Sequence, residues 1–406
     1  MRGSMAAQAD SRRLAGSALA EALRESRAVT LARVADLDDA AWEVPFGRGL
    51  NPIAWELGHL AWFAEFWILR GPHALAADGF AEATRPARIA GPDALYDSAR
   101  LAHADRWRHA WPKRDALFVT LQAQLEACIE AIPNPAAGTD DNADTALYFH
   151  RLALFHEDMH AEAFTWMRAA LGLAAPAGLR LRATSTRRSL QVAAASVTEG
   201  REPAAPGFSF DNEVPARTVR LEAFEIDSAP IDNAAFLAFV EAGGYDEPRF
   251  WPGAAAAWRA THGGNHPARW RRHQGRWQAR WFDRWQPLAT DLPVMHVSAY
   301  EAEAWCRWAR RRLPSAAEWA HAAQTCPGFE WGGTVWEWTA DPFAPYPGFV
   351  PGPYRDYSLP WFGNHRELRG GSFATHARVH HPSYRNFFTP DRTDVFAGFR
   401  SCAPGS

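Results

Sequence analysis

The sequence is poor in cysteine and has no cysteine pairing pattern. Its 406 residues include only four cysteines, which lie far apart and form no C-x-x-C motif: Cys128, Cys306, Cys326 and Cys402. Such spacing argues against a disulfide framework and against a thiolate zinc site, and it is typical of proteins from a reducing compartment. We therefore expect a cytoplasmic protein.

Long apolar runs and an excess of one charge are absent as well. No segment approaches the roughly 18 consecutive apolar residues that a membrane-spanning helix needs, and the N-terminal segment has no apolar core of a signal peptide. The formal net charge is only -3, although 22% of the residues are charged. Bulk charge therefore predicts neither a nucleic-acid partner nor a membrane partner.

Tryptophan, in contrast, is abundant. The chain has 20 tryptophans, a residue that lines ligand sites as well as filling cores. In residues 269–285, RWRRHQGRWQARWFDRW, tryptophan alternates with arginine. This pattern is compatible with stacking on single-stranded nucleic acid or with a β-hairpin whose tryptophans face inward. We favour the hairpin, because the rest of the chain is not basic.

The N-terminal part of the chain has the apolar spacing of amphipathic or buried helices. Helices are expected over four segments, residues 18–37, 52–69, 114–131 and 144–171. Asn51 before Pro52 is typical of an N-cap followed by a first-turn proline, and Gly172 ends the last segment. This arrangement predicts a four-helix bundle.

The C-terminal part of the chain has a different pattern of apolar and turn-forming residues. After a weakly patterned stretch over residues 172–207, short apolar runs alternate with glycine and proline turns. Short helices are expected only over residues 298–310 and 315–323. The sequence therefore predicts an α+β multidomain protein, with a helical domain over residues 1–178 and a loop-rich α+β domain over residues 179–406.

Two histidines in the stretch FHEDMH have the spacing of metal ligands. His156 and His160 fall one turn apart on one face of the expected helix, which suits two ligands of one metal ion. The letters also match the H-E-x-x-H pattern of zinc peptidases, in which Glu157 would be the general base. The continuation AEAFTWMRAALG supplies no third histidine, so the peptidase reading has no support beyond these five letters.

A third candidate ligand, His59, lies within the very apolar helix expected over residues 52–69. A histidine in such a core needs a polar partner. That partner is either a metal ion shared with the other two histidines or a buried carboxylate such as Glu56 or Glu65. Imidazole suits Zn, Fe, Cu and Ni alike, so the ligand set does not choose the metal.

Several motifs together resemble a known enzyme family. NPIAWELGHLAWFAE and HEDMHAEAF resemble the DinB-like bundle of the ergothioneine-type sulfoxide synthases. FSFDNE, VSAYEAEAWCRWARRRLPSAAEW, VWEWTADPFAPYPGF, LRGGSF, YRNFFTP and FAGFR resemble a formylglycine-generating-enzyme type domain, a C-type-lectin-like α+β fold. The reactive cysteine pair of a true formylglycine-generating enzyme is missing from RGGSFATHARVHHPSYRN.

The resemblance implies a mononuclear non-haem Fe(II) enzyme that uses O2 to join a chalcogen atom to the imidazole C2 of hercynine. It implies that the three histidines bind the iron. Glu56 stands where the family has a further histidine and is not expected to bind iron. The resemblance also implies that Asn386 and Phe387 hold hercynine, whose quaternary ammonium suits aromatic faces. Tyr346 falls near the tyrosine that delivers a proton in the family.

Two departures bear on the second substrate. The region LYDSARLAHADRWRHAWPKRD lacks the arginine pair that holds the carboxylates of γ-glutamylcysteine in the family. Phe388 replaces the aspartate that follows Asn-Trp in the family's RNWD motif. Both losses favour a neutral donor, and the pattern is similar to the selenoneine synthase subgroup, which joins a selenosugar to hercynine. Arg106 and Asp105 are then candidates to contact the sugar hydroxyls.

Two alternatives stay open at this point. The first is an ergothioneine sulfoxide synthase that uses cysteine or γ-glutamylcysteine. The second is a zinc-dependent thiol transferase or hydrolase, which would hold zinc and need no O2.

Overall fold

The computed structural model describes residues 11–133 and 140–404, and the chain forms two compact units. Unit 1 comprises Met1–Met167, Ala204–Phe210 and Pro351–Tyr357, and unit 2 comprises Arg168–Pro203, Asp211–Val350 and Ser358–Ser406. The first change between units falls at residues 167 and 168, compared with the domain boundary at 178 and 179 expected from the sequence. In addition, two short later segments belong to unit 1. The sequence predicted a division of the chain at a single point and did not predict them.

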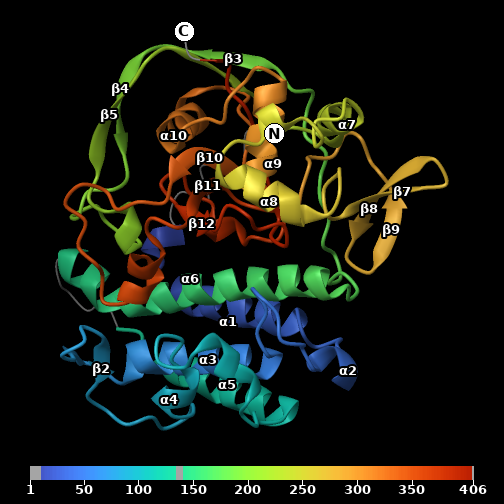
Figure 1. Ribbon diagram of the computed structural model, residues 1–406. Helices are drawn as coiled ribbons and strands as arrows, with labels where there is room; N and C mark the ends of the chain where they lie inside the picture. Colours follow the sequence, from blue (N-terminus) through green and yellow to red (C-terminus); the bar gives the residue numbers. More distant parts are fainter. Residues whose placement is uncertain (1–10, 134–139, 405–406) are drawn as a thin grey trace. The chain divides into compact units, whose positions relative to one another are not determined.

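Unit 1 contains the long helices (Figure 1). They are α1 (Gly16–Ala32), α3 (Ile53–Ala64), α5 (Arg114–Glu130) and α6 (Asp140–Leu171). The last turn of α6, from Arg168, belongs to unit 2. Shorter elements are η1 (Ser11–Arg13), α2 (Asp39–Trp42), the π-helical turn η2 (Glu65–Leu69), β1 (His73–Leu75), β2 (Ala81–Ala83), α4 (Asp93–Tyr96), η3 (His103–Trp107) and η6 (Arg355–Tyr357). The four predicted helices are thus confirmed to within a few residues at most ends.

Leucines hold the bundle together. Leu19 and Leu23 of α1 pack with Leu125 of α5 and with Leu147 and Leu154 of α6 in one buried cluster. Helix α3 lies beside α5 and is buried on every side, as its almost continuous apolar sequence predicts. A polar side chain on α3 therefore has to find its partner inside the bundle.

The predicted N-cap at Asn51 is wrong. Pro52 occupies the N-cap position of α3, which has no side-chain cap. The Asn51 amide instead donates a hydrogen bond to Glu56 Oε1 at 2.7 Å. Gly172 confirms its predicted role, because its φ of +69° is the left-handed conformation that glycine adopts at helix ends.

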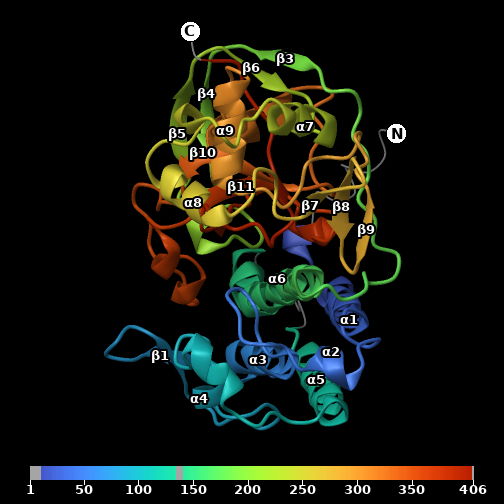
Figure 2. The ribbon, with the colours of Figure 1, turned by 45° about the vertical axis from the view of Figure 1, so that its right-hand side comes forward.

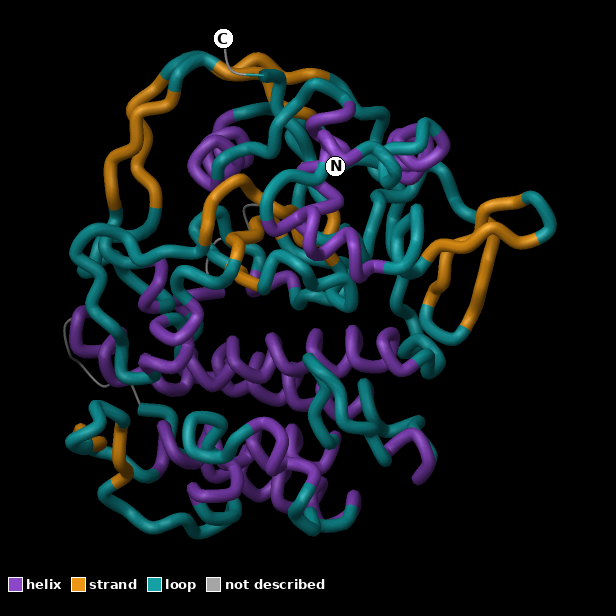
Figure 3. The backbone as a smooth tube through the Cα atoms, in the orientation of Figure 1, coloured by secondary structure: helices purple, strands orange, loops and turns teal. Residues whose placement is uncertain are grey.

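Unit 2 has short strands, short helices and many loops, which Figure 3 colours orange, purple and teal. Its main sheet has the order β12-β11-β10-β13, with strands β10 (Trp336–Pro342), β11 (Arg366–Gly370), β12 (Asn386–Phe388) and β13 (Ala397–Gly398). Smaller sheets pair β3 (Ser189–Val192) with β6 (Phe224–Asp227), β4 (Ala195–Glu199) with β5 (Arg217–Leu221), and β7 (Trp270–His273) with β8 (Arg276–Trp281) and β9 (Arg284–Pro287). Single 3-10 turns are η4 (Asp211–Glu213), η5 (Pro248–Phe250), η7 (Leu359–Trp361) and η8 (Ala377–Val379).

The helices of unit 2 are α7 (Asn233–Glu241), α8 (Ala254–His262), α9 (Ala299–Trp308) and α10 (Ala316–Thr325). The last two confirm the prediction, and each begins with a serine and glutamate capping box, which satisfies otherwise free backbone N–H groups. Helices α7 and α8 were not predicted. Both are short and rich in alanine and apolar residues, so their sequences do not distinguish a helix from a buried apolar run.

The alternating arginine and tryptophan stretch forms a three-stranded antiparallel sheet, which Figure 2 shows as β7, β8 and β9. Trp270 is buried, whereas Arg272, Arg276 and Arg284 are exposed. This confirms the hairpin interpretation of the pattern. Among the residues that the structure describes, no helix has both the length and the apolar character needed to cross a membrane.

Candidate metal centre

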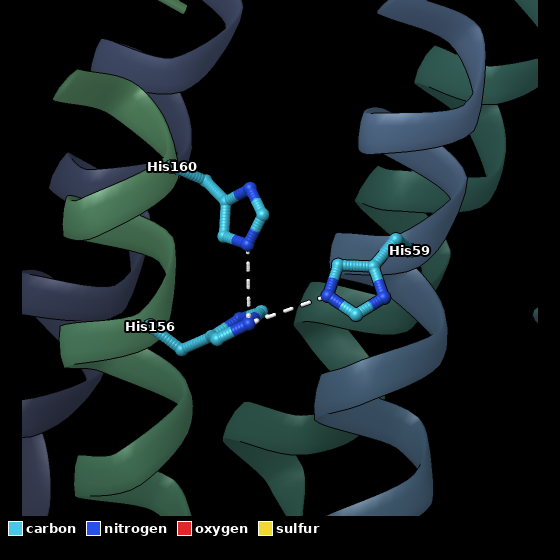
Figure 4. Close-up of side chains that lie close together, drawn as sticks. All are labelled: His59, His156 and His160. Carbon is cyan, nitrogen blue, oxygen red and sulfur yellow. Dashed lines mark hydrogen bonds between the residues drawn. The ribbon is translucent and has the colours of Figure 1, made fainter. Parts of the chain in front are cut away.

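The three predicted ligands come together inside unit 1 (Figure 4). Helix α3 supplies His59, and helix α6 supplies His156 and His160, which its pitch places one turn apart. His59 and His156 are almost completely buried, at 2% and 4% exposure, and His160 is partly exposed. The site is therefore mostly enclosed but open at one ligand.

The Nε2 atoms of the three rings converge. His156 Nε2 lies 3.3 Å from His59 Nε2 and 3.2 Å from His160 Nε2. Ligand nitrogens that share one ion at about 2.1 Å are themselves roughly 3.0–3.4 Å apart. The spacing thus fits one metal ion bound by three nitrogens. Within residues 11–133 and 140–404, this is the only group of three or more histidine, cysteine or carboxylate side chains with such an arrangement.

Hydrogen bonds fix which nitrogen of two rings carries the hydrogen. The Nδ1 of His59 lies 2.7 Å from the Tyr96 carbonyl oxygen, which can only accept, so Nδ1–H is the donor. The Nδ1 of His160 lies 2.5 Å from Glu56 Oε2 and likewise donates to the carboxylate. Each ring therefore presents the lone pair of Nε2 to the centre of the cluster, as a metal ligand must.

The two carboxylates considered as partners of His59 have other roles. Glu56 accepts from His160 rather than from His59. Glu65 accepts backbone N–H groups of Arg88 and Ala90, each at 2.6 Å, and so orders a loop. The buried-carboxylate explanation of His59 is thereby excluded, because its Nδ1 bonds to a backbone carbonyl and its Nε2 faces the cluster.

Burial keeps two of the imidazoles, those of His59 and His156, neutral. It lowers the pKa of His59 to about 3, with the neighbouring His160 adding to the effect. The same two causes, burial first, lower the pKa of His156 well below its ordinary value. Neutral imidazole is the form that binds a metal, so these two rings need no deprotonation at neutral pH.

The glutamate of the H-E-x-x-H pattern is engaged in an ion pair. Glu157 Oε1 and Oε2 accept from Arg27 Nε and Nη2 at 2.6 and 3.0 Å, and both residues are almost fully buried. Arg27 also donates to Gln124 and to the Leu121 carbonyl. A carboxylate held in this way by α1 is a structural group of the bundle, and it is unsuited to act as the general base of a peptidase.

Aromatic rings enclose the histidines. The Trp55 ring stacks on His59 at 4.9 Å, and the Phe63 ring stacks on His156 at 3.6 Å between centroids. Tyr354 packs edge-on against both Phe63 and His156, at 4.9 and 6.1 Å. Burial, followed by the charge of a nearby aspartate, raises the pKa of Tyr354. Its phenol is therefore protonated at neutral pH.

Sequence reasoning missed Tyr354. It lies eight positions after Tyr346 in the same proline-rich and glycine-rich stretch. Nothing in the residue types distinguishes the two tyrosines. Only the return of residues 351–357 to unit 1 brings one of them to the histidines.

Arg106, a predicted substrate-binding residue, belongs to the same unit. Its guanidinium lies 3.7 Å from the Trp55 ring centroid and donates to Asn51 Oδ1 at 2.7 Å. It also lines a cavity of about 740 Å³, together with Trp42, Trp107, Trp111 and Arg114. The structure thus places Arg106 between this cavity and the helix that carries His59.

Tyr346 and the predicted hercynine-binding residues belong to unit 2, where Arg385 and Phe343 connect Tyr346 to Phe387. Tyr346 is 3% exposed, and the guanidinium of Arg385 lies 4.0 Å from its ring centroid. Arg369 Nη2 lies 3.4 Å from the Tyr346 hydroxyl. Arg385 also lies over Phe343, whose ring stacks on that of Phe387 at 4.1 Å. Burial, the largest cause, raises the pKa of Tyr346.

The strand β12 carries Asn386, Phe387 and Phe388 at the edge of the main sheet. All three side chains are half-buried. Asn386 Oδ1 accepts from the Phe387 backbone N–H at 2.9 Å, and Arg392 lies 5.1 Å from the Phe388 ring centroid. Their assignment to a substrate stays a prediction.

Comparison with known proteins identifies both parts of the chain. Residues 22–164 match the DinB superfamily. Residues 180–332 and 328–403 match the sulfatase-modifying factor enzyme 1-like domain. The predicted fold class, an N-terminal DinB-like helical bundle followed by a formylglycine-generating-enzyme type α+β domain, is confirmed.

Some relatives match this chain over nearly its whole length. The chain is 30% identical to the hercynine oxygenase of Mycolicibacterium smegmatis, over 95% of this chain and 99% of the relative. It is equally similar to the hercynine oxygenase of Mycobacterium tuberculosis, over 93% of this chain and 96% of the relative. The formylglycine-generating enzyme of Streptomyces coelicolor is also 30% identical, but the match covers only 57% of this chain and 93% of that enzyme.

Proposed function

Because this chain belongs to the hercynine oxygenase family and is therefore an enzyme, we propose that it uses Fe(II) and O2 to join a chalcogen atom to the imidazole C2 of hercynine. The observation that carries the proposal is the convergence of three Nε2 atoms, from His59, His156 and His160, in one enclosed site of unit 1. Three imidazole ligands leave further positions of an ion open to small ligands.

Iron is proposed from the family and not from the ligand atoms, because imidazole binds several metals. Fe(II) held by the three histidines would supply the activation of O2. The protein groups around it have separate tasks. Tyr96 and Glu56 hold the rings of His59 and His160 in position, and the stacked Trp55 and Phe63 exclude water from two of the ligands.

Hercynine binding is proposed for Asn386, Phe387 and Phe388. A quaternary ammonium has no hydrogen to donate, so aromatic faces are its natural partners. The stacked rings of Phe343 and Phe387 offer such a surface. The Asn386 amide is a polar group on the same strand that suits the hercynine carboxylate.

Two tyrosines are candidates for the proton donor. The family resemblance supports Tyr346, whereas contacts within unit 1 support Tyr354, which touches the ring of a metal ligand. The phenol of Tyr354 keeps its proton at neutral pH, so its Oη–H is available to a reacting group.

A selenosugar is the proposed chalcogen donor. The chain lacks the arginine pair that would hold an amino-acid donor, and Phe388 replaces an aspartate. A neutral donor needs neither group. Arg106, which lines the cavity of unit 1, is proposed to contact the sugar hydroxyls, since guanidinium N–H groups are good donors to oxygen. Cysteine and γ-glutamylcysteine are the competing donors.

The zinc-dependent alternative has less support. Its general base would be Glu157, and both oxygens of that carboxylate bind Arg27 in the bundle core. A hydrolase or transferase at this site would therefore need a base from elsewhere.

The test is anaerobic reconstitution with Fe(II) and hercynine, followed by air and one donor per reaction. Mass spectrometry then searches for a hercynine adduct. A product only with the selenosugar, with the isotope pattern of selenium, is the expected result. A sulfoxide adduct with cysteine or γ-glutamylcysteine would replace the selenium donor by sulfur. Absence of product with every donor, together with tightly bound zinc, would overturn the proposal.

A further inference from the structure

A chain of hydrogen bonds leads from Arg106 to one of the proposed metal ligands. Arg106 Nη1 donates to Asn51 Oδ1 at 2.7 Å. The Asn51 Nδ2 donates to Glu56 Oε1 at 2.7 Å. The other oxygen of Glu56 accepts from His160 Nδ1 at 2.5 Å. All four residues belong to unit 1, and the contacts join α3, η3 and α6.

Glu56 is a buried carboxylate with a hydrogen-bond donor on each of its oxygens. It is 2% exposed, and each of its oxygens has one of these two partners. A buried carboxylate without partners would be costly. The fixed Nδ1–H of His160 and the amide of Asn51 supply them, so the position of Glu56 is determined on both sides.

A carboxylate that accepts the outer N–H of a ligand histidine acts on the metal through the ring. It holds the ring orientation, it keeps the hydrogen on Nδ1, and it increases the electron density at Nε2. The Glu56–His160 contact has this arrangement, because Nδ1 faces Glu56 while Nε2 faces the other two histidines.

Arg106 supports a second ligand at the same time. Its guanidinium lies 3.7 Å from the Trp55 ring centroid, and the Trp55 ring is nearly parallel to His59, with an interplanar angle of 11°. One side chain is thus connected to His160 through Asn51 and Glu56, and to His59 through Trp55. The two connections reach ligands on two different helices.

We infer that Glu56, held by Asn51 and Arg106, is a positioning residue that sets the affinity and geometry of the three-histidine metal centre. The inference rests on the proposed function only in taking these histidines as metal ligands. It does not depend on the donor, on hercynine or on the metal being iron.

Glu65 provides a matched control. It is as buried as Glu56, at 2% exposure for each, and follows α3 directly, but its oxygens accept backbone N–H groups of residues 88–90. Replacing it removes a buried charge near the same helix without touching a histidine.

The experiment measures Co(II) binding to the full chain in the wild type and in the variants Glu56→Gln, Asn51→Ala and Glu65→Gln. A chromophoric chelator competes for the ion and gives the dissociation constant, and the d–d absorption of bound Co(II) reports its coordination. Losing the hydrogen-bond partner of a ligand histidine typically weakens metal binding by about 10-fold to 100-fold. We expect a loss of this size and a changed spectrum for Glu56→Gln, a smaller loss for Asn51→Ala, and wild-type behaviour for Glu65→Gln.

Wild-type affinity and spectrum in folded Glu56→Gln and Asn51→Ala would overturn the inference. An equal loss in Glu65→Gln would also overturn it, because the effect would then belong to any buried carboxylate of this region. If Glu56→Gln does not fold, Asn51→Ala decides. Co(II) binding needs no turnover, so failure of the protein to convert hercynine would refute the proposed function while leaving this result intact.

Discussion

At the residue scale, two of the proposed metal ligands are held by partners from other segments of the chain: His59 donates to the Tyr96 carbonyl, and His160 donates to Glu56. The i, i+4 spacing predicted that His156 and His160 share a face, and the apolar surroundings of His59 indicated that it needs a buried partner. The roles of Glu56 and Tyr354 could not be predicted in this way. Glu56 meets His160 across 104 positions of the chain, and such a contact exists only after the helices have packed.

Removal of a proposed ligand should abolish metal binding. We expect His156→Ala to bind no stoichiometric metal and to form no hercynine adduct, because one of three converging Nε2 atoms is lost. His150→Ala is the control, since His150 is a buried histidine of the same helix that bonds to the Cys128 carbonyl at 3.1 Å. Elemental analysis after Fe(II) loading measures the outcome. A full equivalent of metal in His156→Ala would contradict the assignment.

Replacement of Glu157 should affect stability far more than metal binding. Glu157→Gln leaves the buried guanidinium of Arg27 without its counter-charge. Breaking a buried ion pair costs about 3–5 kcal/mol. Urea unfolding should show a loss of this order, while Co(II) affinity of the folded variant stays close to that of the wild type. Unchanged stability with complete loss of a hydrolytic activity would instead assign Glu157 to catalysis.

Removing one hydroxyl group at a time can distinguish whether Tyr346 or Tyr354 is the proton donor. Loss of a general acid typically lowers a rate by about 10²-fold to 10⁴-fold. We expect such a loss for Tyr354→Phe, with Fe(II) affinity and melting temperature little changed, because the ring contacts with Phe63 and His156 persist. For Tyr346→Phe we expect a smaller effect on rate, since its hydroxyl lies beside Arg369 in a buried cluster. The opposite ranking would return the proton donor to Tyr346.

At the element scale, the long periodic segments were the predictable part of the fold. The helices of unit 1 and the capping boxes of α9 and α10 follow from local sequence. Asn51 shows why local rules fail near the site. Its sequence position is that of an N-cap. Its side-chain nitrogen Nδ2 nevertheless donates to Glu56, and its side-chain oxygen Oδ1 accepts from Arg106. The Asn51 side chain therefore bonds to the side chains of Glu56 and Arg106 instead of capping the backbone at the start of α3.

The capping box of α10 should make stability depend on pH. Burial alone would raise the pKa of Glu318, but hydrogen bonds from Arg312 and Ser315 outweigh it and hold that pKa below the usual value of a glutamate. A carboxyl whose pKa is lower in the folded state contributes stability above its unfolded pKa, and this contribution is lost as pH falls through the folded value. The difference in melting temperature between the wild type and Glu318→Gln should therefore be largest near neutral pH and shrink below about pH 4.5.

Replacement of Glu301 in α9 should change stability with the opposite dependence on pH. Burial raises its pKa in the folded state. A raised carboxyl pKa means that ionisation opposes folding, so the advantage of the wild type over Glu301→Gln should decrease as pH rises. Glutamine retains the capping geometry in both variants. Parallel pH curves for the two variants would contradict this account of the charges.

At the scale of the whole molecule, unit 1 is not a continuous segment of the chain. Residues 204–210 and 351–357 belong to it. The Phe208 ring stacks on the ring of Phe155 at 5.1 Å, and Phe155 directly precedes the proposed ligand His156 in the sequence. The prediction from the sequence, which assigned residues 179–406 to one domain, placed both segments in the C-terminal domain. No periodicity or composition marks them, because their assignment depends on long-range packing alone.

A truncated bundle should consequently be defective. We expect a fragment of residues 1–178 to melt at a lower temperature than the full chain and to bind Co(II) more weakly, because it lacks Phe208 and Tyr354. Thermal unfolding and chelator competition measure both effects. A fragment with a sharp transition and full-chain Co(II) affinity would show that the two returning segments are dispensable for the centre.

The central claim is that the three histidines hold an ion for oxidative chemistry on hercynine. The most direct test exposes two forms of one protein preparation, loaded with Fe(II) or with Zn(II), to hercynine, selenosugar and air, and follows hercynine by mass spectrometry. The account predicts that hercynine is consumed and a C2 adduct appears only in the Fe(II) form. Equal conversion by the Zn(II) form, or no loss of hercynine with Fe(II) and any donor, would contradict it.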